Sequence, residues 1–216
     1  MLDLLTSRVE MYRLLRDAFS YPATEGLIRR LSSLEPDVEA APALHAVARS
    51  LHGILGQVRQ GEELLEELNR EHSRLMAGPG LPPAPPYGSY YRDPEGTLFG
   101  SENQSVAEVY RRHGFAPASP GVPADHLVLE LEFMAALAGA ATVTAAEKRG
   151  VDLRDSLKAQ RAFLREHLIP LSRAFTNRLL EAKPSDFFAG LAQLLYQYLT
   201  SDLAFLEEVE TPLQMA

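Results

Sequence analysis

The stretch at 122–137, V-P-A-D-H-L-V-L-E-L-E-F-M-A-A-L, constrains the fold more than any other part of the chain. Its apolar residues cover almost the whole circumference of a helix, which predicts a helix buried on all sides in a helical domain. Yet this stretch also carries Asp125, His126, Glu130 and Glu132. Titratable groups on a central helix need either a structural partner or a function.

The spacing of these groups allows two interpretations. Pro123 suits a first helical turn, and Asp125 then lies near the positive end of the helix dipole. His126 and Glu130 are four residues apart and share a face. In the structural interpretation, Asp125 is a helix N-terminal residue and His126 is a core histidine oriented by Glu130. In the functional interpretation the same side chains line a binding site, and both stay open on spacing alone.

The rest of the chain predicts helices only. Hydrophobic residues make up 46% of the chain and charged residues 23%, with many Leu and Ala and few β-branched residues, as is typical of a helical domain. No alternating apolar and polar run is long enough for a strand. We therefore expect an all-α fold, a single globular domain over residues 1–216 with about eight to ten helices.

Breaker residues and apolar periodicity give the expected bounds. Gly150 is expected to stop the central helix, which can extend to Arg149, and the segment 207–216 is expected to be a flexible tail. Ser185 is the expected N-cap of the last helix. The other helices are predicted near residues 4–19, 24–34, 42–58, 62–76, 103–113, 153–168, 171–182 and from 185 onward.

Charge and hydropathy exclude several classes of partner. The net charge is −8, with 21 basic and 29 acidic residues, so no nucleic-acid partner is expected. The N-terminus predicts an amphipathic helix, neither a signal peptide nor a membrane anchor. No run reaches the roughly 18 uninterrupted apolar residues of a spanning helix, so no stable membrane insertion is expected.

Motifs for catalysis, cofactors and metals are missing from the sequence. It contains no phosphate loop, no G-x-G-x-x-G, no H-E-x-x-H and no G-x-S-x-G. There is no cysteine, which excludes disulfides and thiolate ligands. Glu130 and Glu132 are two apart and do not face each other on a helix, which argues against an acid-base pair. His45 and His52 share a helix face, but no nearby carboxylate completes a metal shell. We therefore expect neither an enzyme nor a bound cofactor or metal.

A long irregular segment precedes the central helix. Residues 78–96 read G-P-G-L-P-P-A-P-P-Y-G-S-Y-Y-R-D-P-E-G, with six prolines and four glycines in nineteen residues. This composition predicts a loop without helix, and connections of this length in a compact domain are usually functional or disordered. Tyr87, Tyr90 and Tyr91 favour packing against the body; a proline-rich linker is the alternative.

Three motifs resemble a known family. The segments 71–80 (E-H-S-R-L-M-A-G-P-G), 85–91 (P-P-Y-G-S-Y-Y) and 123–134 (P-A-D-H-L-V-L-E-L-E-F-M) are similar, in order and spacing, to three successive signatures of the TorD/DmsD/NarJ redox-enzyme maturation chaperones. One departure concerns the late H-L-x-P-W pattern of many members. It appears here as His167, Leu168, Pro170 and Leu171, without a tryptophan anywhere in the chain.

The resemblance implies a cytoplasmic chaperone, a monomer or an exchanged dimer. Such a chaperone binds the apo catalytic subunit of a molybdopterin-dependent oxidoreductase, by its twin-arginine signal peptide or N-terminal segment, until cofactor is inserted. The same resemblance implies that a peptide groove is lined by Tyr87, Ser89, Tyr91, Asp125 and His126.

The chemistry of such a peptide adds roles for these positions. Two arginines followed by an apolar run need carboxylates beside an apolar wall. Our hypothesis is that Asp125 pairs with a client arginine, while His126 fixes the groove or hydrogen-bonds the client backbone. Glu130 is expected to add charge, and Phe133 to add apolar wall.

Two other function classes stay open. The first is a regulator that binds a small molecule or guanine nucleotide, although the missing phosphate loop argues against it. The second is a structural subunit of an oxidoreductase complex, which predicts co-purification with the mature, cofactor-loaded enzyme.

Overall fold

The computed structural model describes residues 2–34, 49, 62–78, 80–93, 98–117, 119 and 121–214. The helix predicted over 42–58, with His45 and His52, lies outside the described residues except for residue 49, which is helical. Every named element of the described residues is helical, and the only β pairing among them is an isolated bridge. The predicted all-α fold is confirmed.

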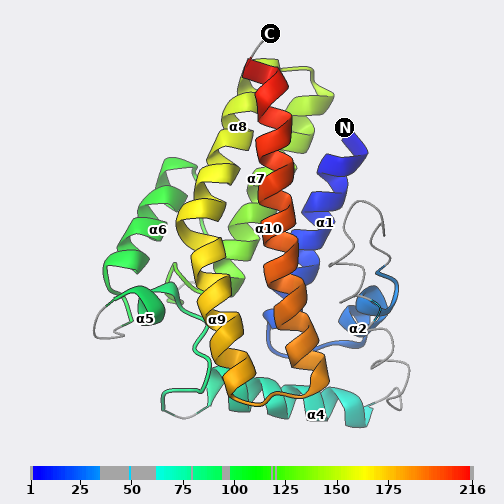
Figure 1. Cartoon of the computed structure of the whole chain (residues 1–216), viewed down its shortest axis with the longest axis vertical. Helices are drawn as coiled ribbons and strands as arrows, with labels where there is room; N and C mark the ends of the chain where they lie inside the picture. The colour runs from blue at the N-terminus through cyan, green and yellow to red at the C-terminus, as the bar shows by residue number, and fades with distance from the viewer. Residues whose placement is uncertain are drawn as a thin grey trace.

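Five long helices form an elongated bundle (Figure 1). Helix α7 packs against α1 and α8, and α9 packs against α10. A π-helical turn, η2 (Leu164–Leu168), joins α8 to α9 without a break. The five helices are α1 (Leu2–Phe19), α7 (Leu127–Ala146), α8 (Gly150–Phe163), α9 (Ile169–Glu181) and α10 (Asp186–Gln214).

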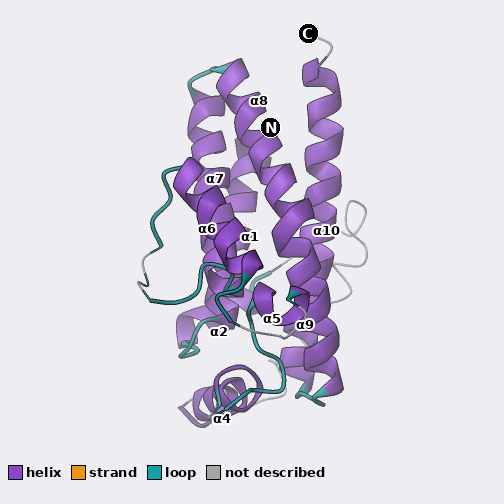
Figure 2. Cartoon of the chain, turned by 90° about the vertical axis from the view of Figure 1, so that its left-hand side faces the viewer, coloured by secondary structure: helices purple, strands orange, loops and turns teal. Residues whose placement is uncertain are grey.

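Shorter elements cover one end and one side of this bundle. Helix α4 (Glu62–His72) crosses beneath it and is seen end-on in Figure 2; it continues into a second π-helical turn, η1 (Ser73–Ala77). Helices α5 (Gly88–Arg92) and α6 (Ser101–Arg112) lie on the side of the bundle, while α2 (Glu25–Ser32) follows α1.

Helix α7 is the core helix predicted from its apolar circumference. Leu127, Leu131, Met134, Ala138 and Ala141 are fully buried along it. Among the described residues, α7 is also the one helix long and apolar enough to cross a membrane, but 61% of its most apolar window is buried inside the protein. Burial against neighbouring helices accounts for the apolarity of α7.

Local signals set several helix ends as expected. Helix α1 stops before Tyr21-Pro22, and the Thr24 hydroxyl caps α2 by accepting a hydrogen bond from the Leu27 N–H at 3.2 Å. After α6, Gly114 takes a left-handed conformation with φ +64°, which glycine adopts without steric cost.

One predicted helix start and one predicted helix stop are wrong. Helix α7 begins at Leu127 rather than Pro123, because the residues before it form a turn closed by the His126 N–H and the Pro123 carbonyl at 3.1 Å. Gly150 is the first residue of α8 rather than a stop signal. Helix α7 ends earlier, at Ala146, and Lys148 makes the left-handed turn with φ 58°.

Two further differences concern segments expected to be non-helical. The segment 78–96 contains α5, because its prolines lie at positions 79–86 and 94 and leave residues 88–92 free to form one helical turn. Helix α10 begins directly after Ser185 and continues to Gln214, so most of the segment 207–216 is helical. The flexibility expected for that segment stays a prediction.

Candidate functional site

The three family-like motifs meet around one cavity of about 510 Å³, here called the motif groove. It lies where the end of α1, the turn η1, the proline-rich segment and the start of α7 come together. Its lining includes Phe19, Tyr21, His72, Met76, Pro85, Pro86, Tyr87, Val122, His126 and Leu129. Motifs separated along the sequence thus form one surface feature.

The rim of the motif groove is apolar and open to solvent. Tyr21 is 62% exposed, Leu81 67%, Leu98 42% and Val122 39%. Scattered exposed apolar residues are normal on a protein surface, but a contiguous set around a cavity marks an interaction site. The rim therefore suits an apolar ligand or segment.

A backbone bridge fastens the proline-rich segment to the start of α7. Tyr87 and His126 form an isolated antiparallel bridge, in which the Gly88 N–H donates to the Asp125 carbonyl at 2.9 Å and the Leu127 N–H donates to the Pro86 carbonyl at 2.8 Å. The rings of Tyr87 and His126 meet edge to face, with centroids 4.9 Å apart. The second and third motifs therefore form one wall of the motif groove.

Two histidines line the motif groove in their neutral form. His126 caps α7, because its Nδ1 accepts a hydrogen bond from the Val128 N–H at 3.1 Å, so Nε2 carries the proton. Burial, followed by the charge of His72, lowers the pKa of His126 to about 4. His72 donates from Nε2 to the Phe19 carbonyl at 3.0 Å, and burial lowers its pKa as well. The floor of the motif groove is therefore uncharged at neutral pH.

Asp125 lies behind the motif groove and is fully buried. Its Oδ2 accepts a hydrogen bond from the Ser89 N–H at 2.5 Å and so caps α5, while Oδ1 has no partner among the described residues. The turn that carries Asp125 is fixed on both sides of Ala124: the Tyr110 hydroxyl donates to its carbonyl at 3.0 Å, and its N–H donates to Asn103 Oδ1 at 2.7 Å. Asp125 thus ties α5 to the start of α7.

The seven predicted site residues differ in exposure: three are partly exposed and four are buried. Tyr87 and His126 line the motif groove, and Tyr91 is half-buried beside α9 with its hydroxyl buried. The interior holds the other four, Ser89, Asp125, Glu130 and Phe133, none of which is more than 1% exposed. In this conformation these four side chains lack the exposure that direct contact with a client needs.

The expectations for Glu130 and Phe133 need correction. Neither carboxylate oxygen of Glu130 has a partner among the described residues, so Glu130 does not orient His126; the Val128 N–H does. Burial, followed by the charges of Glu102 and Asp125, raises the pKa of Glu130 well above its ordinary value, which favours the neutral acid. Phe133 packs in an aromatic core with Tyr110 and Phe163, at centroid distances of 4.8 Å, and not in a groove wall.

The sequence interpretation missed a second polar cluster, which joins α5, α6 and η2. Arg92 Nη1 lies 2.6 Å from Glu102 Oε1 and 2.7 Å from the Glu166 carbonyl, and His167 Nδ1 lies 2.7 Å from the same Glu102 oxygen. Burial raises the pKa of Glu102, but hydrogen bonds from His167 and Arg92 outweigh it and hold the pKa below its ordinary value. The late H-L-x-P pattern was the available signal for this cluster.

The sequence interpretation also missed Tyr21 and His72 as groove residues. Their rings lie 5.6 Å apart. His72 is the only histidine of the first motif, which was the signal that could have found it.

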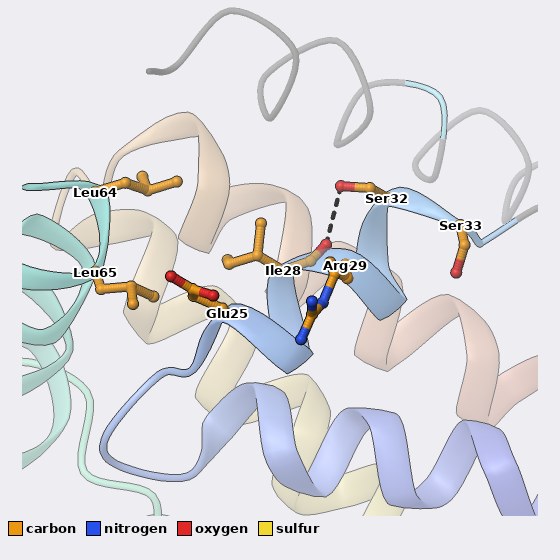
Figure 3. A pocket seen from close by; sticks show the side chains of 7 residues that line it. All are labelled: Glu25, Ile28, Arg29, Ser32, Ser33, Leu64 and Leu65. Atoms are coloured by element: carbon orange, nitrogen blue, oxygen red, sulfur yellow. Dashed lines mark hydrogen bonds between the residues drawn. The ribbon is translucent and has the colours of Figure 1, made fainter. Parts of the chain in front are cut away.

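Another pocket lies between α2 and α4 (Figure 3). It has a volume of about 440 Å³ and is lined by Glu25, Ile28, Arg29, Ser32, Ser33, Leu64 and Leu65. None of these described residues has a buried side-chain polar atom without a partner. None belongs to the three motifs, so the motif groove is the stronger candidate. No group of three or more His, Asp or Glu side chains in the described part of the chain could hold a metal ion.

Comparison with known proteins identifies a family for this chain. The family model described as "Nitrate reductase delta subunit" matches residues 35–177. A relative from Ferrimonas balearica, described as "Chaperone protein TorD", is 30% identical over 178 residues, which is 82% of this chain and 75% of the relative. One from Haemophilus influenzae, described as a Tat proofreading chaperone, DmsD, is 30% identical over 132 residues, covering 61% and 58% of the two chains.

A solved structure shares the fold. A crystal structure from Archaeoglobus fulgidus, described as a redox enzyme maturation protein, superimposes with a TM-score of 0.51 at 23% identity and covers 89% of this chain and 93% of that one. At this identity the likeness shows the fold alone.

Proposed function

The chain belongs to the nitrate reductase delta subunit family, and from that premise we propose that it is a redox-enzyme maturation chaperone. Its client is the apo catalytic subunit of a molybdopterin-dependent oxidoreductase, bound by a twin-arginine signal peptide or N-terminal segment and held for cofactor insertion. The proposal includes a cytoplasmic location, since holding precedes export or assembly, and a monomer or exchanged dimer as the working form.

The observation that carries the proposal is the motif groove itself. A cavity of about 510 Å³ with an apolar, exposed rim and two neutral histidines is suited to the apolar run of such a segment. His126 Nε2–H is a donor for a client carbonyl. The net charge of −8 favours encounter with a segment that carries arginines.

The roles of the predicted residues follow from where each side chain lies. We assign direct client contact to Tyr87 and His126. Asp125 acts through the backbone, because its carboxylate holds Ser89 and thereby the segment that forms the groove wall. A direct pair between Asp125 and a client arginine would need α5 to move away, since the carboxylate is fully buried beneath it.

Binding of a defined peptide tests the groove. The probe is a labelled synthetic peptide with two arginines, a short polar spacer and an apolar run of leucine and alanine, and its affinity is measured by fluorescence anisotropy. Tyr87→Ala and Leu81→Ser should each weaken binding by about tenfold, which corresponds to about 1.4 kcal/mol. Val151→Ser is the matched control for Leu81→Ser, since Val151 is 73% exposed at the start of α8 and away from the groove.

The groove assignment fails if Leu81→Ser and Val151→Ser leave the same affinity. The function is tested separately by using the chain as bait in its own host and assaying the captured proteins for molybdenum. Capture of a metal-depleted oxidoreductase subunit would support the chaperone function. A metal-loaded enzyme would instead indicate a structural subunit.

A further inference from the structure

We propose that Glu102, His167 and the Glu166 carbonyl form a binding site for a guanidinium group, filled by Arg92 in the free protein and by a client arginine in the complex. This inference rests on the proposed function, and it gives the arginines of the client a place that the motif groove, with its neutral histidines, does not offer. Arg92 then acts as an internal competitor.

The first step is the set of acceptors that surround the Arg92 guanidinium. Glu102 Oε1 lies 2.6 Å from Nη1 and is held at 2.7 Å by His167 Nδ1. The carboxylate accepts and His167 Nδ1 donates, which fixes Glu102 in place. Glu102 and His167 are both buried. A charged acceptor held in position at the surface of a bundle is suited to a guanidinium.

The second acceptor is explained by the sequence of the late motif. In a regular α-helix the Glu166 carbonyl would accept from the N–H of residue 170, but residue 170 is proline and has no N–H. The Arg92 Nη1 atom donates to this carbonyl at 2.7 Å. The H-L-x-P pattern therefore supplies two parts of one site: His167, which holds Glu102, and Pro170, which has no N–H to donate to the Glu166 carbonyl at α-helical spacing.

Arg92 fills this site loosely. Among the described residues, only its Nη1 has hydrogen-bond partners, so the two-pronged contact that guanidinium makes with carboxylate is not formed. The Arg92 side chain is 39% exposed, and a contact that is open to water and single-pronged contributes little to stability. A second guanidinium can therefore compete for the same acceptors.

Unpaired carboxylate oxygens lie behind the same site. A Cβ added at Gly88 would lie 3.1 Å from Glu102 Cγ and 3.5 Å from Asp125 Cβ, so these two acids flank the start of α5. Asp125 Oδ1 and both oxygens of Glu130 are buried without a partner among the described residues. Buried polar atoms are normally satisfied. Asp125 Oδ1 therefore remains an acceptor without a donor beside the start of α5.

The distance to the motif groove fits one peptide. Tyr87 lines the groove and Arg92 ends α5, five residues on; a helical rise of about 1.5 Å per residue separates them by roughly 7–8 Å. An extended chain spans that distance in two to three residues at about 3.3 Å each. A segment with its apolar run in the groove can therefore present a nearby arginine to Glu102.

The experiment compares two peptides on three proteins. The peptides are the labelled probe described above and a version in which both arginines are glutamine. The proteins are wild type, Arg92→Ala and Arg111→Ala; Arg111 pairs with Glu108 on the exposed face of α6 and is the control for the change in net charge. Removing an internal competitor raises the fraction of the protein in which the guanidinium site is free. Arg92→Ala should therefore bind the arginine peptide about three- to tenfold more tightly than wild type. The glutamine peptide and Arg111→Ala should show no such gain.

Two further measurements keep the test decisive. Glu102→Gln should weaken the arginine peptide by at least about threefold and leave the glutamine peptide unchanged; if this variant unfolds, Arg92→Lys should give an intermediate gain, because lysine competes without a planar fork. Methylguanidinium at millimolar concentration should raise the melting temperature of Arg92→Ala and not that of wild type. This last result does not depend on peptide binding.

The outcomes separate the two proposals. If wild type binds neither peptide, the proposed function is wrong, and the methylguanidinium measurement alone decides the guanidinium site. If wild type binds both peptides but Arg92→Ala gains nothing for the arginine peptide, the guanidinium site is wrong and the groove stands. An equal gain for both peptides would show that Arg92 only restrains α5, which also overturns the competitor role.

Discussion

Two buried polar clusters in this bundle differ in how well their groups are satisfied. In the first, Arg8 on α1 meets Asp202 on α10 through two hydrogen bonds of 2.5 and 3.0 Å, and Gln160 and Tyr12 complete the network at 2.6 Å each. In the second, around α5, Asp125 uses one carboxylate oxygen, Glu130 uses neither, and Arg92 bonds through a single nitrogen.

The difference separates a structural role from a binding role. The Arg8 cluster joins three long helices, and only Nη1 of its guanidinium lacks a partner among the described residues. A paired and hydrogen-bonded buried charge holds its helices in register. The α5 cluster holds a five-residue helix against the bundle with incomplete partners, which agrees with the binding role that we propose for it. Predictions follow from this contrast.

The largest loss of stability is expected from breaking the Arg8 cluster. Asp202→Asn removes the charge opposite Arg8 and leaves a buried guanidinium uncompensated, which should lower the free energy of unfolding by about 3–5 kcal/mol. Urea unfolding followed by circular dichroism measures the change. Arg13→Ala, which breaks an exposed pair with Glu10 on the same helix, should change it by less than about 0.5 kcal/mol.

The same variant also tests the division of roles. At a temperature where Asp202→Asn is folded, its affinity for the arginine-containing peptide should equal that of wild type, because Asp202 lies away from the groove-lining residues. A large loss of affinity in the folded variant would show that the two clusters are coupled and would remove the contrast drawn above.

Asp125→Ala should show the opposite balance. It removes the cap of α5 and leaves the Ser89 N–H without its acceptor, which should cost about 1–2 kcal/mol of stability. Because this bond holds the wall of the motif groove together with the two backbone hydrogen bonds of the bridge, affinity for the peptide should fall by about tenfold. Asp125→Asn keeps an acceptor oxygen and serves as the control, with most of the affinity retained. Equal losses from both variants would instead favour the charged pairing of Asp125 with a client arginine.

Glu130→Gln should stabilise the protein at alkaline pH. The pKa of Glu130 is raised in the folded state, so its contribution is complete below the unfolded pKa of about 4.5 and is lost as the pH rises through the folded pKa. Glutamine keeps the neutral shape, and its advantage over wild type in free energy of unfolding should therefore grow as the pH rises. Unfolding measured from pH 5 to 9 tests this; parallel curves for the two proteins would contradict a neutral Glu130.

The sequence predicted the helical class and the core helix because periodicity and apolarity act locally. The residues spaced along one face of α10 are apolar and buried, namely Phe187, Phe188, Leu191, Leu194, Leu195, Tyr198 and Leu199. The start of α7 was misplaced because it depends on tertiary contacts. Pro123 could begin a helix, but the bridge to Pro86 and Gly88 holds His126 in an extended conformation. Helix α7 therefore begins only at Leu127.

The candidate site was predictable in position but not in detail. The motifs indicated that Tyr87 and His126 lie together, and they share one groove wall. Helical spacing could not tell that Glu130 points into the core, because a helix apolar on all sides has no solvent face to serve as a reference. The pairing of Glu102 with His167 joins residues 65 positions apart and needed the packing of α6 on η2.

The smallest effect is expected at His126, in the pH dependence of stability and of peptide affinity. Its pKa is lowered to about 4 in the folded state, so its contribution to stability is present above the unfolded pKa of about 6.5 and is lost as the pH falls toward 4. His126→Asn keeps a capping oxygen for the Val128 N–H and cannot be protonated.

The variant should therefore lose less stability than wild type between pH 6.5 and 4. His72, whose pKa is also lowered, loses stability over this range in both proteins and so does not account for the difference. Peptide affinity in wild type should fall only as the pH approaches the folded pKa of about 4, because a protonated His126 loses its bond to Val128 and places a charge beside the apolar run and the client arginines. Affinity that stays constant below pH 4, where His126 is protonated, while the Arg92→Ala gain persists would mean that the arginine site, rather than the groove wall, dominates recognition of the client.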